Sequence, residues 1–186
     1  MTQVHCVPGL HGGIRRGVAR KLRGDRDITA STTCYVFACT LDPVNQDLAH
    51  IATIGAVGDR FFVDGRLAGP NRDAALETRR QGLLEIEETP DGERYILRTA
   101  DGPVECSVFA RNLDTLGGAG YHRGGPELGV RVCLEGRSPE TDAVLGELRP
   151  LQERVFSEEI DRIRQDGWNI TGHIQWLHVE DRFEPM

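Results

Sequence analysis

The stretch HIATIGAVGDRFFVDG, residues 50–65, decides how this chain is interpreted. Apolar side chains dominate its first half, which is typical of buried core, and Gly55 and Gly58 allow close backbone approach. The run ends in a carboxylate, Asp59, and the guanidinium of Arg60 follows directly. This pair is either a surface turn or a functional carboxylate that serves as a metal ligand or general base. For the second role we expect Asp59 at a helix or segment end on an exposed concave surface and not within a packed core, because an unpaired buried carboxylate is costly.

Composition limits the class of protein. The 186 residues suffice for one substantial domain or two small ones, and 39% hydrophobic and 27% charged residues are typical of a globular chain. The net charge of −7 argues against a generally basic nucleic-acid surface, although a local arginine patch stays possible. Lys21 is the only lysine, so nearly all cationic side chains are arginines. Arginine suits phosphate recognition, but a GC-rich genome gives the same bias.

The five cysteines form no C-x-x-C pair, and most lie in apolar stretches. They indicate buried thiols in a reducing compartment rather than disulfides or a zinc site. No apolar run reaches the length of a membrane span, and the N-terminus lacks the apolar core of a signal peptide. We therefore expect a cytoplasmic protein without a membrane partner.

Periodicity and breaker residues predict a mixed α/β fold. We expect an arm or loop over residues 1–27 and a buried helix over 28–41, capped by Asp27 or Thr29 and ended by Asp42-Pro43. The other expected elements are a helix or buried segment over 44–58, helices over 69–82, 103–117 and 138–167, a hairpin or two short strands over 83–88 and 93–99, and a strand over 168–181. Ser138 is expected to cap the longest helix and Pro150 to kink it.

A second candidate site is the glycine-rich stretch LGGAGYHRGGPELG, residues 116–129. Backbone amides at the start of a helix favour an anion, and His122 and Arg123 add charge or hydrogen bonds. The stretch is neither a P-loop nor a Rossmann fingerprint. A flexible turn with a solvated histidine explains it equally well. No G-x-S-x-G pattern supports a hydrolase triad.

Three segments together resemble the DHH phosphoesterases, above all their archaeal RecJ-like branch. DLAHIATIGAVGDRF resembles the fourth motif, in which an apolar segment ends in a metal-binding aspartate. NLDTLGGAGYHRGGPELGVRVCL resembles the glycine-rich segment of the DHH-associated domain, and NITGHIQWLHVEDRFEPM resembles the closing strand. The resemblance covers roughly residue 27 to the end.

The resemblance implies a manganese- or magnesium-dependent hydrolase that acts on phosphodiester or related bonds. Asp59 is then a metal ligand, and Arg60 is a possible accessory residue that orients Asp59 or meets a phosphate. The implied substrate-binding residues all lie in the glycine-rich stretch: Gly117, Gly118, Gly120, His122, Arg123, Gly124 and Gly125. Residues 28–92 would be the helical remainder of the catalytic lobe, and 93–186 an incomplete substrate-binding domain.

This chain departs from the family pattern because the first two aspartate motifs and the Asp-His-His triplet are absent. We therefore expect a fragment, a split gene product or a degenerate relative that is inactive alone, and the implied partner is a separate chain that carries the missing motifs. Exonuclease, oligonucleotidase, cyclic-dinucleotide and pyrophosphate substrates stay open. The alternative is a non-catalytic module that binds single-stranded nucleic acid or a replication protein.

Overall fold

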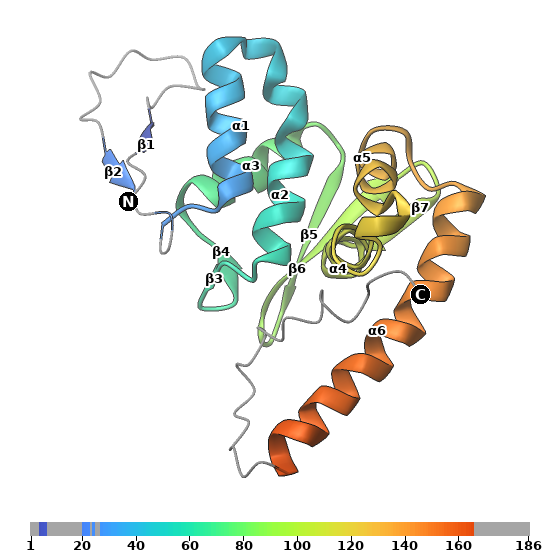
Figure 1. Cartoon of the computed structure of the whole chain (residues 1–186). Helices are drawn as coiled ribbons and strands as arrows, with labels where there is room; N and C mark the ends of the chain where they lie inside the picture. The colour runs from blue at the N-terminus through green and yellow to red at the C-terminus, as the bar shows by residue number, and fades with distance from the viewer. Residues whose placement is uncertain (1–3, 7–19, 23, 25–26, 166–186) are drawn as a thin grey trace. The chain divides into compact units, whose positions relative to one another are not determined.

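The computed structural model describes residues 4–6, 20–22, 24 and 27–165. The fold is mixed α/β, with helices and small antiparallel sheets (Figure 1). The chain divides into two compact units, Met1–Ala110 and Arg111–Met186. The strand expected over 168–181 lies outside the described residues.

The arm expected as a loop contains two short strands. β1 (Val4–Cys6) pairs antiparallel with β2 (Arg20–Leu22). Neither strand carries a long alternating pattern, which is why periodicity did not predict them.

Three α-helices form the body of the first unit. They are α1 (Ala30–Leu41), α2 (Ala49–Gly58) and α3 (Gly69–Arg80), with the 3₁₀ helix η1 (Pro43–Leu48) between the first two. Thr29 caps α1 by accepting a hydrogen bond from the Thr32 amide, as expected, and α1 ends before Asp42-Pro43. Asp42 then caps η1 through the Val44 amide.

Small and polar residues fill the contacts between these helices. Thr29 donates through its backbone N–H to Asn71 Oδ1 (3.1 Å), and the Thr53 and Thr78 hydroxyls lie 2.9 Å apart. These side chains are buried, and their hydrogen bonds offset the cost of removing polar groups from water. The three helices are therefore fastened by hydrogen bonds as well as by apolar packing.

The expectation that the first helix is buried is correct on one side only. Tyr35 packs into the core, whereas Phe37 is 63% and Leu41 is 70% exposed. The helix carries no charged residue, so sequence gave no polar stripe from which to assign the solvent face.

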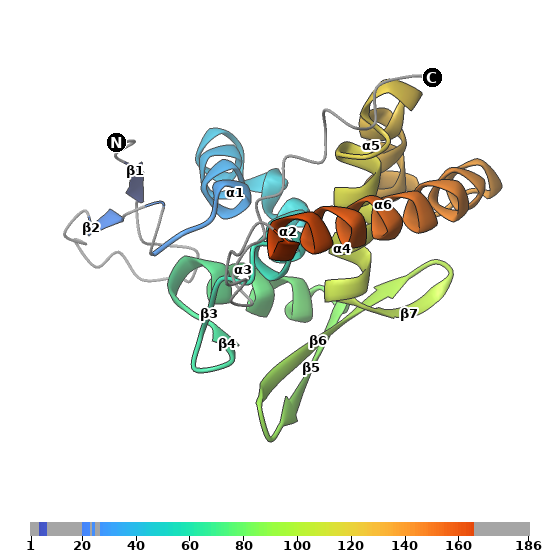
Figure 2. The same cartoon turned by 60° about the horizontal axis from the view of Figure 1, so that its bottom comes forward.

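A three-stranded antiparallel sheet follows α3, in the order β5 (Leu84–Thr89), β6 (Gly92–Thr99) and β7 (Gly102–Glu105), as Figure 2 shows. The β5–β6 hairpin is confirmed. β7 was missed, because the prediction placed its residues from 103 onward in the following helix. The expected domain boundary at residues 92/93 falls at the turn of this hairpin, whereas the compact units divide between Ala110 and Arg111.

The second unit is helical. Its elements are the end of α4 (Cys106–Gly117), the 3₁₀ helix η2 (Tyr121–Arg123), α5 (Gly125–Glu135) and α6 (Pro139–Gln165). Ser138 Oγ accepts from the Thr141 amide at 3.2 Å, as expected for the cap of α6. The helix continues through Pro150. Buried leucines on α4, α5 and α6 form the core: Leu116, Leu128, Leu145 and Leu148.

Candidate functional site

The turn at the end of α2 fixes Asp59 and Arg60. Asp59 is the C-cap, and the Arg60 amide donates to the Val57 carbonyl at 3.0 Å. The Phe61 amide donates to the Ala56 carbonyl at 3.1 Å, which completes a Schellman motif. Asp59 is exposed at a helix end, so the expectation that it lies outside a packed core is confirmed, and the concave surface expected around it stays a prediction.

The electrostatic surroundings of Asp59 disfavour its charge. The carboxylate stands at a helix C-terminus, where the backbone dipole repels an anion. It makes no hydrogen bond or ion pair with any residue that the structure describes, and partial burial raises its pKa above the ordinary value. A nearby cation would relieve both effects.

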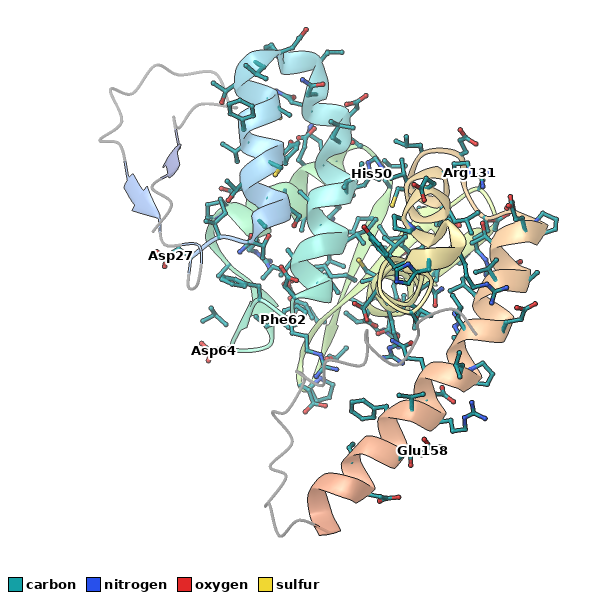
Figure 3. All side chains as sticks on the ribbon, viewed as in Figure 1. Asp27, His50, Phe62, Asp64, Arg131 and Glu158 are labelled. Atoms are coloured by element: carbon teal, nitrogen blue, oxygen red, sulfur yellow. The ribbon has the colours of Figure 1, made fainter. Side chains whose placement is uncertain are left out.

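A short hairpin directly after Asp59 anchors the turn to the sheet. β3 (Phe62–Val63) and β4 (Arg66–Leu67) are joined by Asp64 and Gly65, both at positive φ, in a type I′ turn (Figure 3). The Glu93 amide donates to the Gly65 carbonyl at 2.9 Å. Gly65 and Gly92 approach so closely that a Cβ on either would lie 2.3 Å from a backbone oxygen.

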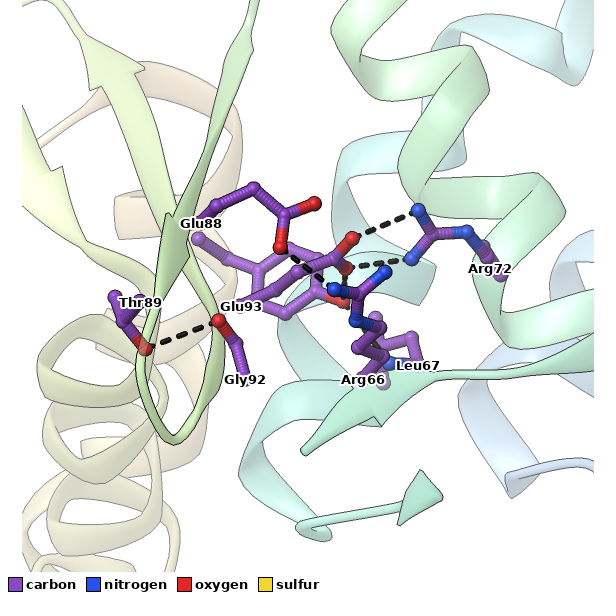
Figure 4. Close-up of polar contacts among 8 residues, drawn as sticks. Arg66, Leu67, Arg72, Glu88, Thr89, Gly92 and Glu93 are labelled. Carbon is purple, nitrogen blue, oxygen red and sulfur yellow. Dashed lines mark hydrogen bonds and ion pairs between the residues drawn. The ribbon is translucent and has the colours of Figure 1, made fainter. Parts of the chain in front are cut away.

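A buried carboxylate joins this hairpin to α3 and β6. Arg72 binds Glu93 with two hydrogen bonds of 2.5 and 2.8 Å, and the Glu93 side chain is 1% exposed against 33% for Arg72. The Tyr95 hydroxyl donates to Glu93 at 2.6 Å and accepts from the Leu67 amide at 2.9 Å (Figure 4). The Tyr95 ring also stacks on Phe62, with centroids 6.1 Å apart.

The sequence did not predict this network. Side chains alternate between the two faces of a strand, so the sequence alone places Glu93 and Tyr95 on the same face of β6. Their partner Arg72 lies on a helix 21 residues earlier than Glu93, and only the tertiary fold brings them together.

The glycine-rich stretch forms the corner between α4 and α5, and its amides donate to carbonyls of the stretch itself and of the preceding residues on α4. The Gly118 amide donates to Asp114 at 2.8 Å, and the Gly120 amide to Thr115 at 3.0 Å. The amides of Arg123 and Gly125 both donate to the Gly120 carbonyl at 2.9 Å. A phosphate bound by these amides would therefore compete with existing hydrogen bonds.

Close packing accounts for two of the glycines. A Cβ on Gly125 would lie 2.0 Å from the Leu116 carbonyl oxygen, and one on Gly120 would lie 2.6 Å from the same atom. Gly124 has φ of 73°, the left-handed region that favours glycine. Gly117 has no neighbouring atom within 4 Å of the added Cβ, so packing does not require a glycine there.

The two charged residues of this corner are exposed. Arg123 pairs with Glu147 on α6 at 2.7 Å, with both side chains about half exposed or more. His122 packs edge-on against Tyr121, with ring centroids 5.2 Å apart. Surface pairs of this kind contribute little to stability, so an anionic ligand can displace Glu147 at small cost.

The structure thus places the predicted residues in two groups. Asp59 and Arg60 are neighbours in the first unit, and the glycine-rich residues with His122 and Arg123 lie in the second. Among the described residues, no three His, Cys, Asp or Glu side chains group as metal ligands.

No protein-family model matches the chain, and a search of curated proteins found no significant match. Within the described parts of the chain, none of the helices combines the length and apolarity required to cross a bilayer.

Proposed function

We propose that this chain contributes to a metal-dependent phosphoesterase of the DHH, RecJ-like class that acts on nucleic acid or nucleotides. Residues from 28 form the helical end of its catalytic lobe, and the later part of the chain forms its substrate-binding domain. The observation that carries the proposal is the exposed Asp59 carboxylate. It has no hydrogen-bond or ion-pair partner among the described residues and lies at the C-terminus of a helix. Such a carboxylate is a suitable ligand for Mn²⁺ or Mg²⁺.

The described residues supply one metal ligand, so the site needs others from outside them. We expect these on the missing DHH motifs, carried by a separate chain. When bound, the metal ions activate water and offset phosphate charge. The contribution of this chain is to hold Asp59 in a fixed turn. α2 precedes this turn, and the hairpin that is anchored to the sheet follows it.

Binding of Mn²⁺ tests the role of Asp59. Titration of the labelled chain should broaden the amide signals of Asp59 and its neighbours, because Mn²⁺ is paramagnetic and even weak, transient contact with a single carboxylate broadens nearby signals. Asp59→Asn should abolish this effect. Asp64→Asn is the matched control, since Asp64 is an exposed carboxylate five residues away in a turn that also accepts asparagine. Equal broadening in wild type and Asp59→Asn would contradict the proposal.

Activity tests the reaction class. The chain is mixed with the polypeptide encoded by the upstream reading frame, and Mn²⁺-dependent cleavage of a single-stranded oligonucleotide is measured. We expect cleavage with wild type and Asp64→Asn and a loss on the order of 100-fold with Asp59→Asn. Oligonucleotide binding without metal dependence or cleavage would favour the non-catalytic module instead.

A further inference from the structure

Two helices of the first unit end in the same hydrogen-bond pattern but with different residues at its key position. In α3 the Gly82 amide donates to Arg79 at 2.9 Å and the Leu83 amide to Thr78 at 3.1 Å. This repeats the motif that ends α2, in which Arg60 stands where α3 has Gly82. The chain therefore holds an internal comparison for Arg60.

The motif requires a left-handed residue at that position. φ is 79° at Gly82 and 52° at Arg60. A left-handed conformation strains an L-residue with a Cβ, and glycine is the usual solution. Asp64 is the other described non-glycine residue at positive φ, and its type I′ turn favours aspartate. No comparable turn preference accounts for an arginine at residue 60.

The Arg60 side chain has no ion-pair partner among the residues that the structure describes. It is exposed and forms no ion pair with a described residue. The next two arginines along the chain differ, because Arg66 binds Glu88 at 2.7 Å and Arg72 binds Glu93. Ion pairing with the described residues of this unit therefore does not explain an arginine in the left-handed region.

We propose that Arg60 is a phosphate-binding residue, which contacts a non-bridging phosphate oxygen of the substrate beside Asp59. This inference rests on the proposed function and identifies the Arg60 guanidinium as the cation that binds the negatively charged substrate. A guanidinium matches phosphate geometry, and its planar fork permits two parallel hydrogen bonds. A chain with net charge −7 repels polyanions, so a cation beside Asp59 offsets that repulsion locally.

The test combines binding and stability. Affinity for a labelled single-stranded DNA oligonucleotide is measured at low salt for wild type, Arg60→Gly, Arg60→Lys and the charge-matched control Arg79→Ala. Loss of a charge-assisted contact predicts roughly 10- to 100-fold weaker binding for Arg60→Gly. Arg60→Lys should retain part of the affinity, because it keeps the charge but loses the fork. Arg79→Ala should bind like wild type.

Stability distinguishes a functional arginine from a structural one. Arg60→Gly should raise the melting temperature by about 2–4 °C, since it relieves the left-handed strain. Gly82→Arg, the reverse change in the equivalent motif, should lower it by a similar amount. A variant that is more stable and binds more weakly is the expected result.

Three results overturn the inference: wild type fails to bind the oligonucleotide at low salt, Arg60→Gly binds as tightly as wild type, or Arg60→Gly gains no stability. The metal role of Asp59 is judged separately. If Asp59→Asn leaves the Mn²⁺ response unchanged while Arg60→Gly weakens binding, the proposed metal site fails and the phosphate contact stands. If Asp59→Asn abolishes the Mn²⁺ response while Arg60→Gly binds as tightly as wild type, the proposed metal site stands and the phosphate contact of Arg60 fails.

Discussion

Glu93 shows how one buried charge organises the surroundings of the candidate site. Its two carboxylate oxygens are satisfied by Arg72 and Tyr95, and Tyr95 in turn holds the Leu67 amide. Because the β3–β4 hairpin begins three residues after Asp59, the network restrains the chain on the far side of the metal-ligand candidate. At the residue scale the sequence indicated Asp59, but it gave no sign of the restraint.

The two partners of this ion pair should respond unequally to substitution. Arg72→Met leaves Glu93 buried and uncompensated, so we expect the free energy of unfolding to fall by about 3 kcal/mol. Glu93→Gln leaves the more exposed Arg72 with access to water and retains an acceptor, so we expect a loss of about 1–2 kcal/mol. Urea unfolding of both variants measures the difference. Equal losses would indicate that the carboxylate is not buried in solution.

Acid should weaken the fold partly through Glu93. Hydrogen bonds from Arg72 hold the pKa of Glu93 below its ordinary value, with help from Tyr95 and against the effect of burial. A depressed folded-state pKa stabilises the fold above the unfolded-state pKa of roughly 4.3, and this contribution is lost as pH falls through the folded-state value. The stability difference between wild type and Glu93→Gln should therefore shrink between pH 5 and pH 3, roughly. A constant difference across that range would assign the stabilisation to packing.

At the scale of elements, local signals predicted most helices and one hairpin. Thr29, Asp42-Pro43 and Ser138 end or begin helices through their own backbone and side-chain chemistry, which is readable in sequence. The β3–β4 hairpin was missed, although Asp64-Gly65 is a type I′ turn signal. Its strands are two residues each, too short for alternation to show.

The glycine-rich corner presents a similar contrast between pattern and packing. Sequence indicated an anion-binding loop, and the structure shows glycines required by the close approach of α4 to α5. The close packing of the glycines leaves Arg123 able to bind an anion, because its exposed ion pair with Glu147 is weak. The helix-to-helix contact could not be predicted, because it depends on how residues 116 and 125 meet in space.

Substitution of individual glycines separates the packing role from the others. Gly125→Ala places a Cβ against two backbone oxygens, at 2.0 and 2.7 Å, so we expect a loss of about 1–3 kcal/mol in the free energy of unfolding. Gly117→Ala meets no atom within 4 Å at the end of α4 and should be neutral or stabilising by up to about 1 kcal/mol. Thermal unfolding compares the two. A large loss from Gly117→Ala would mean that this residue has a contact not seen in the structure.

At the scale of the whole molecule, the chain was predicted as one domain or two small ones, and it forms two compact units. The boundary expected at 92/93 lies inside the β5–β6 hairpin that the sequence also predicted, whereas the compact units divide between Ala110 and Arg111. Turn signals mark where a chain reverses, and whether the segments on either side separate depends on strand pairing. Sequence periodicity does not report that pairing.

The metal ligands that the chain offers limit the catalysis expected without a partner chain. Among the described residues no three potential metal ligands group together, and Asp59 alone cannot hold a catalytic divalent ion. We therefore expect little or no hydrolysis when the isolated chain is incubated with Mn²⁺ and short oligonucleotides. The measurement is release of labelled nucleotide, with Asp59→Asn as the internal control for contaminating nuclease. Because a contaminant is indifferent to Asp59, turnover that persists in Asp59→Asn leaves the expectation intact. Turnover that disappears in that variant would mean that this chain completes its own metal site, with ligands outside the described residues.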